Sequence, residues 1–228
     1  MSIYAIGDLH LSFNTDKPMD VFGWNNYENI IENDWKEKVK EDDLVLLPGD
    51  FSWSMKLEET FKDFEFINNL PGTKILLKGN HDYWWNTYKK MNDYISNLGF
   101  KNIYFLYNNS YLFDNKIICG SRGWNFPKTE EDQKIYDREL LRLQLSLDDG
   151  INKYGKDKEI IVCTHYPPIN SNSDNKILDI LAKYNVKTCI YGHLHGESHK
   201  EAVQGTIKGI DFKLVSSDYL GFKLHKIN

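Results

Sequence analysis

Cysteine is scarce in this chain, and its placement excludes both a disulfide scaffold and a thiolate metal site. The 228 residues include three cysteines, Cys119, Cys163 and Cys189, and each lies inside a short apolar run. An odd number of cysteines in runs of this kind favours buried, reduced thiols. We therefore expect a reducing compartment, the cytoplasm, and any metal site must use other ligands.

Long apolar runs and clusters of basic residues are also missing. No stretch of about 18 consecutive apolar residues occurs, and the chain starts in a strand-like run without the pattern of a secretory leader. The net charge is −5, with lysines and acidic residues interspersed. These absences argue against a membrane partner and a nucleic-acid partner, which need an apolar or a basic surface.

No segment has the composition of a linker, and no repeat of fixed period is present. The six prolines and 15 glycines are scattered, and aromatic residues make up 14% of the chain. That aromatic content is too high for a disordered polypeptide. A chain of this length can bury one substantial core, so we expect a single domain over residues 1–228.

Five short apolar runs are present, and polar side chains follow each of them directly. The runs have the composition of buried strands. The polar residues are Asp8 and His10 after 3–6, Asp50 after 44–47, Asn80, His81 and Asp82 after 75–78, His165 after 160–163, and His193 and His195 after 189–191. In open α/β sheets ligands bind beyond the carboxyl ends of the strands, so we expect these groups to converge.

Apolar residues at helical spacing separate these runs in the first half of the chain. The spacing predicts helices over 26–40, 57–70 and 83–98. Strands that alternate with helices favour a largely parallel sheet.

The second half of the chain has a different pattern of residues. Three aromatic and β-branched runs between 103 and 119 predict a meander with tight turns. A long helix is expected over 129–154, with Thr129 as its N-cap and Gly155 at its end, and a shorter helix near 174–184. Alternation over 205–224 predicts antiparallel strands. Together, the patterns in the two halves predict two packed sheets with helices on their outer faces.

The polar groups at the strand ends suit a pair of metal ions. The seven candidate ligands are too many for one tetrahedral ion and about right for two ions that share a carboxylate: Asp8, His10, Asp50, Asn80, His165, His193 and His195. On extended backbone, Asp8 and His10 face the same way, as do His193 and His195 unless their turn is tight. Mixed oxygen and imidazole ligands suit manganese, iron or zinc. Two ions about 3.5–4 Å apart can clamp a phosphoryl group and activate a bridging water, which favours phosphate-ester hydrolysis.

These motifs resemble, in order and spacing, those of the calcineurin-like metallophosphoesterases. The matching segments are Gly7-Asp8-x-His10, Gly49-Asp50, Gly79-Asn80-His81-Asp82, Thr164-His165 and Gly192-His193-x-His195. The overall pattern is similar to a small bacterial branch of predicted phosphohydrolases, for which the resemblance supplies no substrate.

The resemblance implies a four-layer α/β/β/α sandwich and a dinuclear centre. One ion would be held by Asp8, His10, Asp50 and His195, and the other by Asp50, Asn80, His165 and His193, so that Asp50 is the bridge. The resemblance also implies that His81 is an acid that protonates the leaving oxygen, with Asp82 fixing its orientation. Many relatives carry Glu where Asp82 stands.

Several further residues have two interpretations. Arg122 can offer a forked guanidinium to phosphate oxygens, or it can form a salt bridge with a neighbouring carboxylate. His199 is interpreted as a surface residue, with shielding of the site as the alternative. Four tryptophans near predicted site residues can form an aromatic rim for substrate or pack in the core: Trp53, Trp84, Trp85 and Trp124.

The leading functional hypothesis is a metal-dependent phosphohydrolase that acts on small phosphomonoesters or phosphodiesters. A nuclease and a protein phosphatase are alternative enzymes, and the acidic charge argues against the nuclease. A protein-binding scaffold is the alternative from another class, because one retromer subunit keeps this fold without its catalytic groups. Retention of His81 and of all seven candidate ligands argues against the scaffold.

Overall fold

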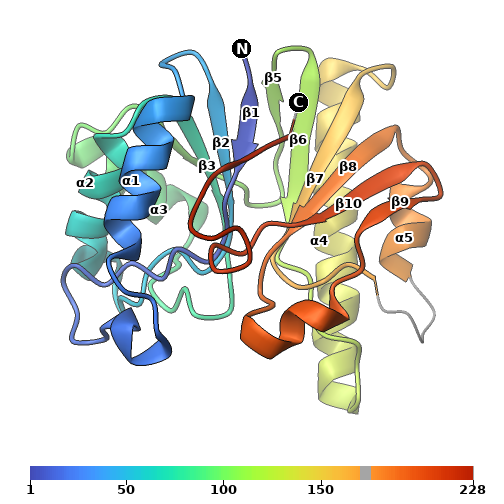
Figure 1. The fold of residues 1–228 in the computed structure, drawn as a ribbon. Coiled ribbons are helices and arrows are strands. Elements are labelled where there is room, and N and C mark those ends of the chain that lie inside the picture. Colours follow the sequence, from blue (N-terminus) through green and yellow to red (C-terminus); the bar gives the residue numbers. More distant parts are fainter. Residues whose placement is uncertain (170–175, 228) are drawn as a thin grey trace.

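Two β-sheets pack face to face in the middle of the molecule, with helices on both outer faces (Figure 1). The computed structural model describes residues 1–169 and 176–227. An apolar cluster fills the space between the sheets and includes Ile3, Leu44 and Ile75 of the first sheet and Ile118 and Ile161 of the second. The predicted four-layer α/β/β/α sandwich is confirmed.

The first sheet is built from the amino-terminal half of the chain and the carboxyl-terminal strand. Its order is β11-β1-β2-β3-β4, and all pairs are parallel except β11 with β1. The strands are β1 (Ile3–Ala5), β2 (Leu44–Pro48), β3 (Thr73–Leu77), β4 (Ile103–Phe105) and β11 (His225–Lys226).

The second sheet has the order β5-β6-β7-β8-β10-β9. Its central pairs are parallel, whereas β5 with β6 and β9 with β10 are antiparallel hairpins. The strands are β5 (Tyr111–Phe113), β6 (Lys116–Ser121), β7 (Glu159–Thr164), β8 (Val186–Tyr191), β9 (Gly205–Ile207) and β10 (Ile210–Leu214). The three cysteines lie buried and unpaired in β6, β7 and β8, as the sequence predicts.

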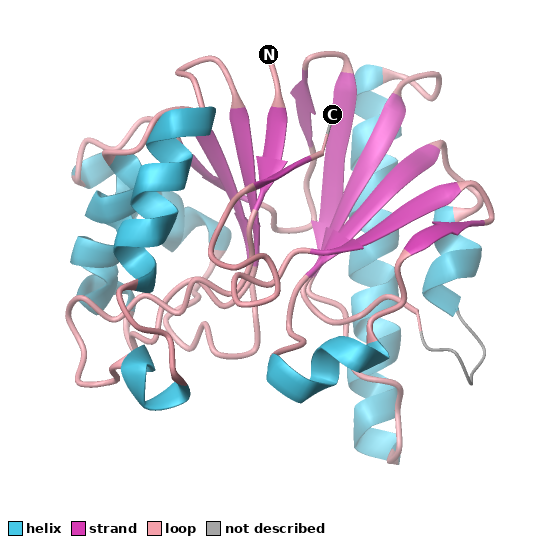
Figure 2. Cartoon of the chain, viewed as in Figure 1, coloured by secondary structure: helices cyan, strands magenta, loops and turns pink. Residues whose placement is uncertain are grey.

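Helices cover the outer face of each sheet (Figure 2). The helices are α1 (Tyr27–Lys38), α2 (Phe61–Asn68) and α3 (Tyr88–Asn97) on the first sheet, and α4 (Glu130–Tyr154) and α5 (Lys176–Leu181) on the second. Short 3-10 helices span Met19–Phe22, Leu57–Thr60 and Gly196–Glu201. In the part of the chain that the structure covers, no helix combines the length and apolarity needed to cross a membrane.

Local chemistry explains where the predicted helices end. Thr129 accepts a hydrogen bond from the Asp132 amide and begins α4, and Gly155, at a φ of 95°, ends it, both as predicted. The helix predicted over 83–98 begins only at Tyr88, because Thr87 accepts a hydrogen bond from the Lys90 amide and acts as its N-cap. The helix predicted near 174–184 is α5, and the beginning of that range lies outside the described residues.

The predicted meander over 103–119 is wrong. The β4 strand pairs in parallel with β3 in the first sheet, and only β5 and β6 form a hairpin, in the second sheet. The Asn109 side chain accepts a hydrogen bond from the Tyr107 amide and donates one to the Phe105 carbonyl. These local bonds turn the chain from one sheet to the other.

The antiparallel strands predicted over 205–224 are only partly correct. The β9–β10 hairpin is present, but β10 also pairs in parallel with β8. Beyond Leu214 the chain leaves the second sheet: the Gly7 amide donates to the Val215 carbonyl, and the Ser217 amide donates to the Gly7 carbonyl. The carboxyl-terminal segment therefore crosses over the end of β1 on its way to β11.

Candidate metal centre

The loops that follow β1, β2, β3, β7 and β8 gather at one edge of the two sheets, the lower edge in Figure 2. Parallel strands present their carboxyl ends at a common edge, so side chains far apart in the sequence can meet there. All seven candidate ligands lie in these loops: Asp8, His10, Asp50, Asn80, His165, His193 and His195.

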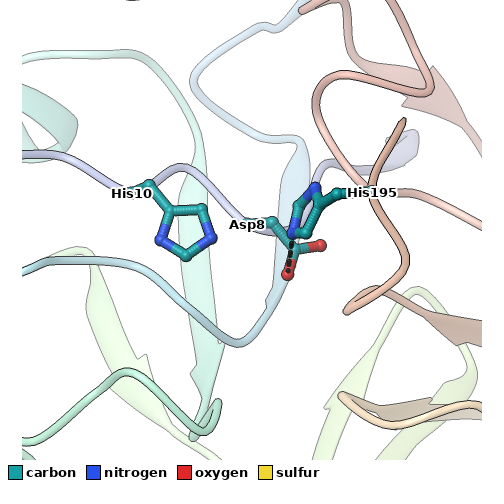
Figure 3. Close-up of side chains that lie close together, drawn as sticks. All are labelled: Asp8, His10 and His195. Carbon is teal, nitrogen blue, oxygen red and sulfur yellow. Dashed lines mark ion pairs between the residues drawn. The ribbon is translucent and has the colours of Figure 1, made fainter. Parts of the chain in front are cut away.

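A first group consists of Asp8, His10 and His195 (Figure 3). One potential ligand atom from each lies within 4.8 Å of the others, and His195 Nε2 is 3.6 Å from Asp8 Oδ1. Asp8 and His10 are buried, whereas the His195 side chain is 33% exposed. The His195 ring therefore reaches the surface, although its Nε2 atom is buried.

A second group consists of Asp8, Asp50 and His165, again with ligand atoms within 4.8 Å of one another. Asp50 Oδ2 is 3.4 Å from His165 Nε2 and 3.7 Å from His10 Nε2. Asp50 thus faces one imidazole from each of the two expected ligand sets. This is the position that a bridging carboxylate requires.

Asn80 joins the remaining histidine to these groups. Its Oδ1 lies 2.7 Å from His165 Nε2 and 2.9 Å from His193 Nδ1. His165 Nδ1 lies 3.1 Å from the Pro48 carbonyl oxygen, to which only a protonated nitrogen can donate. The lone pair of His165 Nε2 then faces oxygen atoms of Asn80 and Asp50, and a cation between them removes that repulsion.

One further nitrogen atom fits a cation in the same way. His195 Nε2 is buried and has no hydrogen-bond partner within the described residues. Buried polar atoms without a partner are rare and costly, and neutral imidazole nitrogens are common metal ligands. The donor set of carboxylates, imidazoles and one amide fits manganese, iron or zinc.

The ligand loops adopt strained backbone conformations. Asp8, His10, Asp50 and His193 have positive φ angles of 56°, 45°, 50° and 73°. The expectation that Asp8 and His10 meet through alternation on extended backbone is therefore wrong, because both lie in left-handed turns. Such residues cost about 1–3 kcal/mol each and tend to occur at functional sites.

His193 and His195 separate for a similar reason. The Leu194 amide donates to the Gly192 carbonyl, which makes a tight turn between the two histidines. His193 points to Asn80 and His195 to Asp8.

Two glycines allow the ligand loops to approach one another. A Cβ atom on Gly79 would lie 2.1 Å from Asp50 Oδ1, and one on Gly192 would lie 2.3 Å from Asp8 Oδ2. The His193 amide donates to both oxygens of Asp8, at 3.0 and 3.1 Å. A side chain at either glycine would displace a carboxylate from the centre.

The carboxylates of the centre influence each other strongly. Burial and the nearby charge of Asp8 raise the pKa of Asp50 to about 8. Burial also opposes ionisation of Asp8, but its contacts with His195, His165 and His10 outweigh burial and hold its pKa below the usual range. A divalent cation would favour the ionised form of both groups.

The imidazoles differ in charge. Burial lowers the pKa of His10 and of His193 to about 3, so both are neutral and suited to metal binding at neutral pH. Burial lowers the pKa of His195 as well, but the hydrogen bond with Asp218 and the nearby Asp8 carboxylate outweigh it and raise that pKa to about 10. His195 is therefore protonated at neutral pH when no cation is bound, and a cation at Nε2 would displace that proton.

Asp218 supports His195 from behind and also contacts His199, and no pattern in the sequence predicts this role of Asp218. His195 Nδ1 lies 2.9 Å from Asp218 Oδ1, and the Gly196 amide donates to Asp218 Oδ2 at 3.0 Å. His199 Nε2 is 3.3 Å from the same Oδ2, and the His199 side chain is 23% exposed, so His199 lies at the surface and also contacts Asp218. Asp218 lies in the segment that was expected to be a strand, and no sequence motif marks it.

His81 lies beside the centre. Its ring centroid is 5.6 Å from that of His10 and 4.6 Å from that of Trp53, and its backbone amide donates to Asp50 Oδ1 at 2.7 Å. The ring is half-buried, and burial followed by the charges of His165 and His195 lowers its pKa.

Asp82 does not orient His81, which corrects the expectation. Its buried carboxylate accepts hydrogen bonds from the amides of Asp50, Phe51, Ser52 and Gly79 and from the indole of Trp84. The buried Nδ1 of His81 has no hydrogen-bond partner among the residues described. Asp82 instead ties the Asp50 loop to the Gly79 loop.

The four tryptophans divide between the two interpretations. Trp53 stacks on His10 at 4.7 Å and is half-buried at the edge of the centre. Trp84 is buried in the core against Phe64, and Trp85 packs on Trp84. Trp124 packs against Tyr166 and lines a groove next to the centre.

That groove has a volume of about 830 Å³ and includes His193 in its wall. Aromatic side chains and charged groups line the rest, among them Trp124, Phe126, Lys128 and Lys200. The size is sufficient for an organic substituent larger than a phosphate group.

Arg122 forms the salt bridge that was the alternative to phosphate binding. Its Nη2 is 3.8 Å from Glu139 Oε1, and its guanidinium lies 4.7 Å from the Trp124 ring centroid. The Arg122 carbonyl accepts hydrogen bonds from the amides of His165 and Tyr166. Arg122 therefore contacts the ligand loop through its backbone, and a direct role for its side chain stays a prediction.

Comparisons with known proteins agree with this geometry. The family model described as calcineurin-like phosphoesterase matches residues 1–197. No curated protein gives a significant match.

Solved structures with a similar fold include three bacterial proteins. A protein of unknown function from Aquifex aeolicus is 18% identical, with a TM-score of 0.53 over 99% of this chain and 95% of that one. The phosphopantetheinyl hydrolase PptH of Mycobacterium tuberculosis is 13% identical, with a TM-score of 0.55 over 99% and 95%. The protein TT1561 of Thermus thermophilus is 11% identical, with a TM-score of 0.59 over 99% and 97%.

Proposed function

The chain belongs to the calcineurin-like phosphoesterase family and is a metal-dependent phosphoesterase. From that premise we propose that it hydrolyses small phosphomonoesters or phosphodiesters at a two-metal centre. The observation that supports this most strongly is the convergence of seven oxygen and nitrogen ligands from five loops. Seven donors exceed the need of one ion.

We propose that two ligand sets share Asp50. Asp8, His10, Asp50 and His195 would hold one ion, and Asp50, Asn80, His165 and His193 would hold the other. The distances from Asp50 Oδ2 to His10 and His165 support this division. When bound, two manganese, iron or zinc ions supply a nucleophile at neutral pH and neutralise charge on the phosphoryl oxygens.

His81 is proposed to donate a proton to the leaving oxygen. Its ring lies next to His10 and Trp53 at the edge of the centre, and it is half-buried. It forms no hydrogen bond to Asp82, so its orientation depends on packing against Trp53.

The groove beside His193 supports an organic leaving group. Trp124 and Phe126 offer apolar area, and the charged residues of the wall are two lysines and two acidic residues, Lys128, Lys200, Asp132 and Glu201. These features fit a small phosphate ester better than a nuclease substrate, because the chain has a net charge of −5 and no basic tract. The buried, unpaired cysteines support a cytoplasmic location, and the apolar cluster that fills the space between the two sheets supports a single domain.

The proposal is tested with p-nitrophenyl phosphate and its bis-ester, in the presence of Mn²⁺. We expect Asp50→Asn to lose bound metal and rate together, because Asp50 faces both ligand sets. We expect His81→Ala to keep its metal content, measured by elemental analysis, and to lose rate.

Two results would contradict these assignments. Metal loss in His81→Ala would show that His81 is a ligand. Equal rates in wild type and both variants would support the scaffold alternative.

A further inference from the structure

A second cavity lies beside the metal centre and has a different character from the groove. Its volume is about 370 Å³. Its walls come from the end of β3, the loop before α3, the loop after β4, the end of β6 and one face of α4. The charged residues in these walls are Lys78, Arg122, Glu139 and Arg142.

Three cations and one carboxylate line this cavity, and two of the cations contact the carboxylate. Glu139 is 2% exposed, and its Oε1 lies 2.7 Å from Arg142 Nη1 and 3.8 Å from Arg122 Nη2. A fourth cation, Arg138, approaches the same oxygen from outside at 4.0 Å. Within the described residues Lys78 has no ion pair at all.

One carboxylate in the cavity wall therefore neutralises only part of the charge of the three cations that line it. The Nε atom of Arg122 is buried without a hydrogen-bond partner among the residues described. Like charges held together in a partly buried space are costly, and an anion placed among them offsets that cost.

The cavity is also connected to the metal centre through the chain. Lys78 precedes Asn80 by two residues, and the Arg122 carbonyl accepts the amide of His165. Asn86 and Thr87 follow His81 and add neutral polar groups to the wall. A molecule in this cavity therefore borders the loops that carry the candidate ligands.

We propose that this cavity binds a phosphate group that is separate from the one being hydrolysed, carried by the substrate or free in solution. The inference rests on the proposed function for its link to catalysis, but anion binding itself does not need the metals. Arginine forks and a lysine ammonium are the side chains that recognise phosphate oxygens most strongly. A volume near the lower limit of ligand sites suits one phosphate with a small attached group.

Binding is tested on protein treated with a chelator, so that the metal centre cannot retain the anion. Inorganic phosphate is titrated into the protein by calorimetry. We expect Lys78→Gln and Arg142→Gln each to weaken phosphate binding about 5- to 30-fold, because each removes one cation from a partly buried site. Lys101→Gln, an exposed lysine elsewhere, is the matched control and should bind as wild type does.

Glu139→Gln gives an effect of the opposite sign. It removes the carboxylate that competes with the anion for Arg122 and Arg142, so phosphate should bind more tightly. A general loss of structure would weaken binding in every variant and cannot produce this gain. Melting temperatures identify variants that do not fold, and if Glu139→Gln is one of them, Lys78→Gln and Arg142→Gln decide the result.

A second measurement separates the two sources of the phosphate. With metal restored, the ratio of kcat/KM for adenosine 3′,5′-bisphosphate to that for adenosine 5′-monophosphate should fall in Lys78→Gln if the substrate carries the second phosphate. If free phosphate is the ligand, that ratio stays constant, and inhibition of p-nitrophenyl phosphate turnover by phosphate has a non-competitive component that Lys78→Gln weakens.

The proposal is overturned if metal-free wild type does not bind phosphate, or if Lys78→Gln and Arg142→Gln bind it as wild type does. Absence of any hydrolytic activity would refute the proposed function and leave the calorimetric result standing.

Discussion

Replacement of Asp82 with asparagine separates two roles for this carboxylate. If Asp82 orients His81, the variant loses rate and keeps its stability. If it ties two ligand loops together, the variant loses stability and metal affinity. The structure predicts the second result, because five N–H groups donate to Asp82 and none of them belongs to the His81 ring.

The magnitude follows from the hydrogen bonds. The amides of Gly79 and Asp50 donate to Oδ2 at 2.7 and 3.0 Å, and the amides of Phe51 and Ser52 and the Trp84 indole donate to Oδ1. An asparagine NH₂ group at either position faces at least two buried donors, which cost about 1–3 kcal/mol each when unsatisfied.

Part of this loss is recovered. Burial, followed by the charge of Asp50, raises the pKa of Asp82 to about 6, so a neutral side chain avoids an unfavourable buried charge. We expect a net loss of about 2–4 kcal/mol in the free energy of unfolding.

Urea denaturation of metal-free protein measures this loss, and calorimetric titration with Mn²⁺ measures metal affinity. His81→Ala is the comparison, because removal of that ring leaves the five hydrogen bonds intact. A stable Asp82→Asn variant with normal metal affinity and a greatly reduced rate would refute the reasoning and restore the orienting role.

Three other changes test separate parts of the structure. Gly192→Ala should reduce the metal content of the folded protein, measured by elemental analysis after dialysis, because its Cβ would lie 2.3 Å from Asp8 Oδ2. Asp218→Ala should lower Mn²⁺ affinity about 10- to 100-fold in calorimetric titration, because it removes the hydrogen-bond partner of His195. Lys74→Met should raise the free energy of unfolding at pH 7 by about 1–3 kcal/mol, because burial lowers the pKa of this fully buried lysine to about 8. Between pH 8 and 10.5 the unfolded wild type binds more protons than the folded wild type, so the free energy of unfolding of the wild type rises with pH. The difference in stability between Lys74→Met and the wild type therefore becomes smaller across this pH range.

Each of these predictions has a control variant or an outcome that would contradict it. Gly99→Ala has open space around its Cβ and a positive φ, so it should cost stability without metal loss, unlike Gly192→Ala. Unchanged Mn²⁺ affinity in Asp218→Ala would mean that His195 needs no support. If the difference in stability between Lys74→Met and the wild type does not change between pH 8 and 10.5, the buried ammonium group is not what destabilises the wild type.

The sequence predicted the strands and the ligand candidates because both depend on local pattern. An apolar run followed by Gly-Asp or Gly-Asn is visible in the sequence, and parallel strands bring such ends to one edge. The N-cap at Thr129 and the stop at Gly155 were predicted for the same reason, since a cap involves residues within one turn of each other.

The sequence did not predict contacts that depend on how distant loops pack. Asp218 reaches His195 only because the chain crosses over the end of β1, where Ser217 Oγ donates to the Asp8 carbonyl. The β4 strand was assigned to the wrong neighbours because the bonds of Asn109 that redirect the chain are made by a single side chain.

By itself, the sequence determined the α/β alternation and the set of polar groups at the strand ends, because hydrophobic periodicity and ligand chemistry belong to each residue and its near neighbours. Only the tertiary structure decided that Asp82 ties two loops together and that Lys78, Arg122 and Arg142 share a cavity with one carboxylate. The reason is physical: a hydrogen bond or an uncompensated charge depends on distances between atoms, and these distances are fixed only when the two sheets pack.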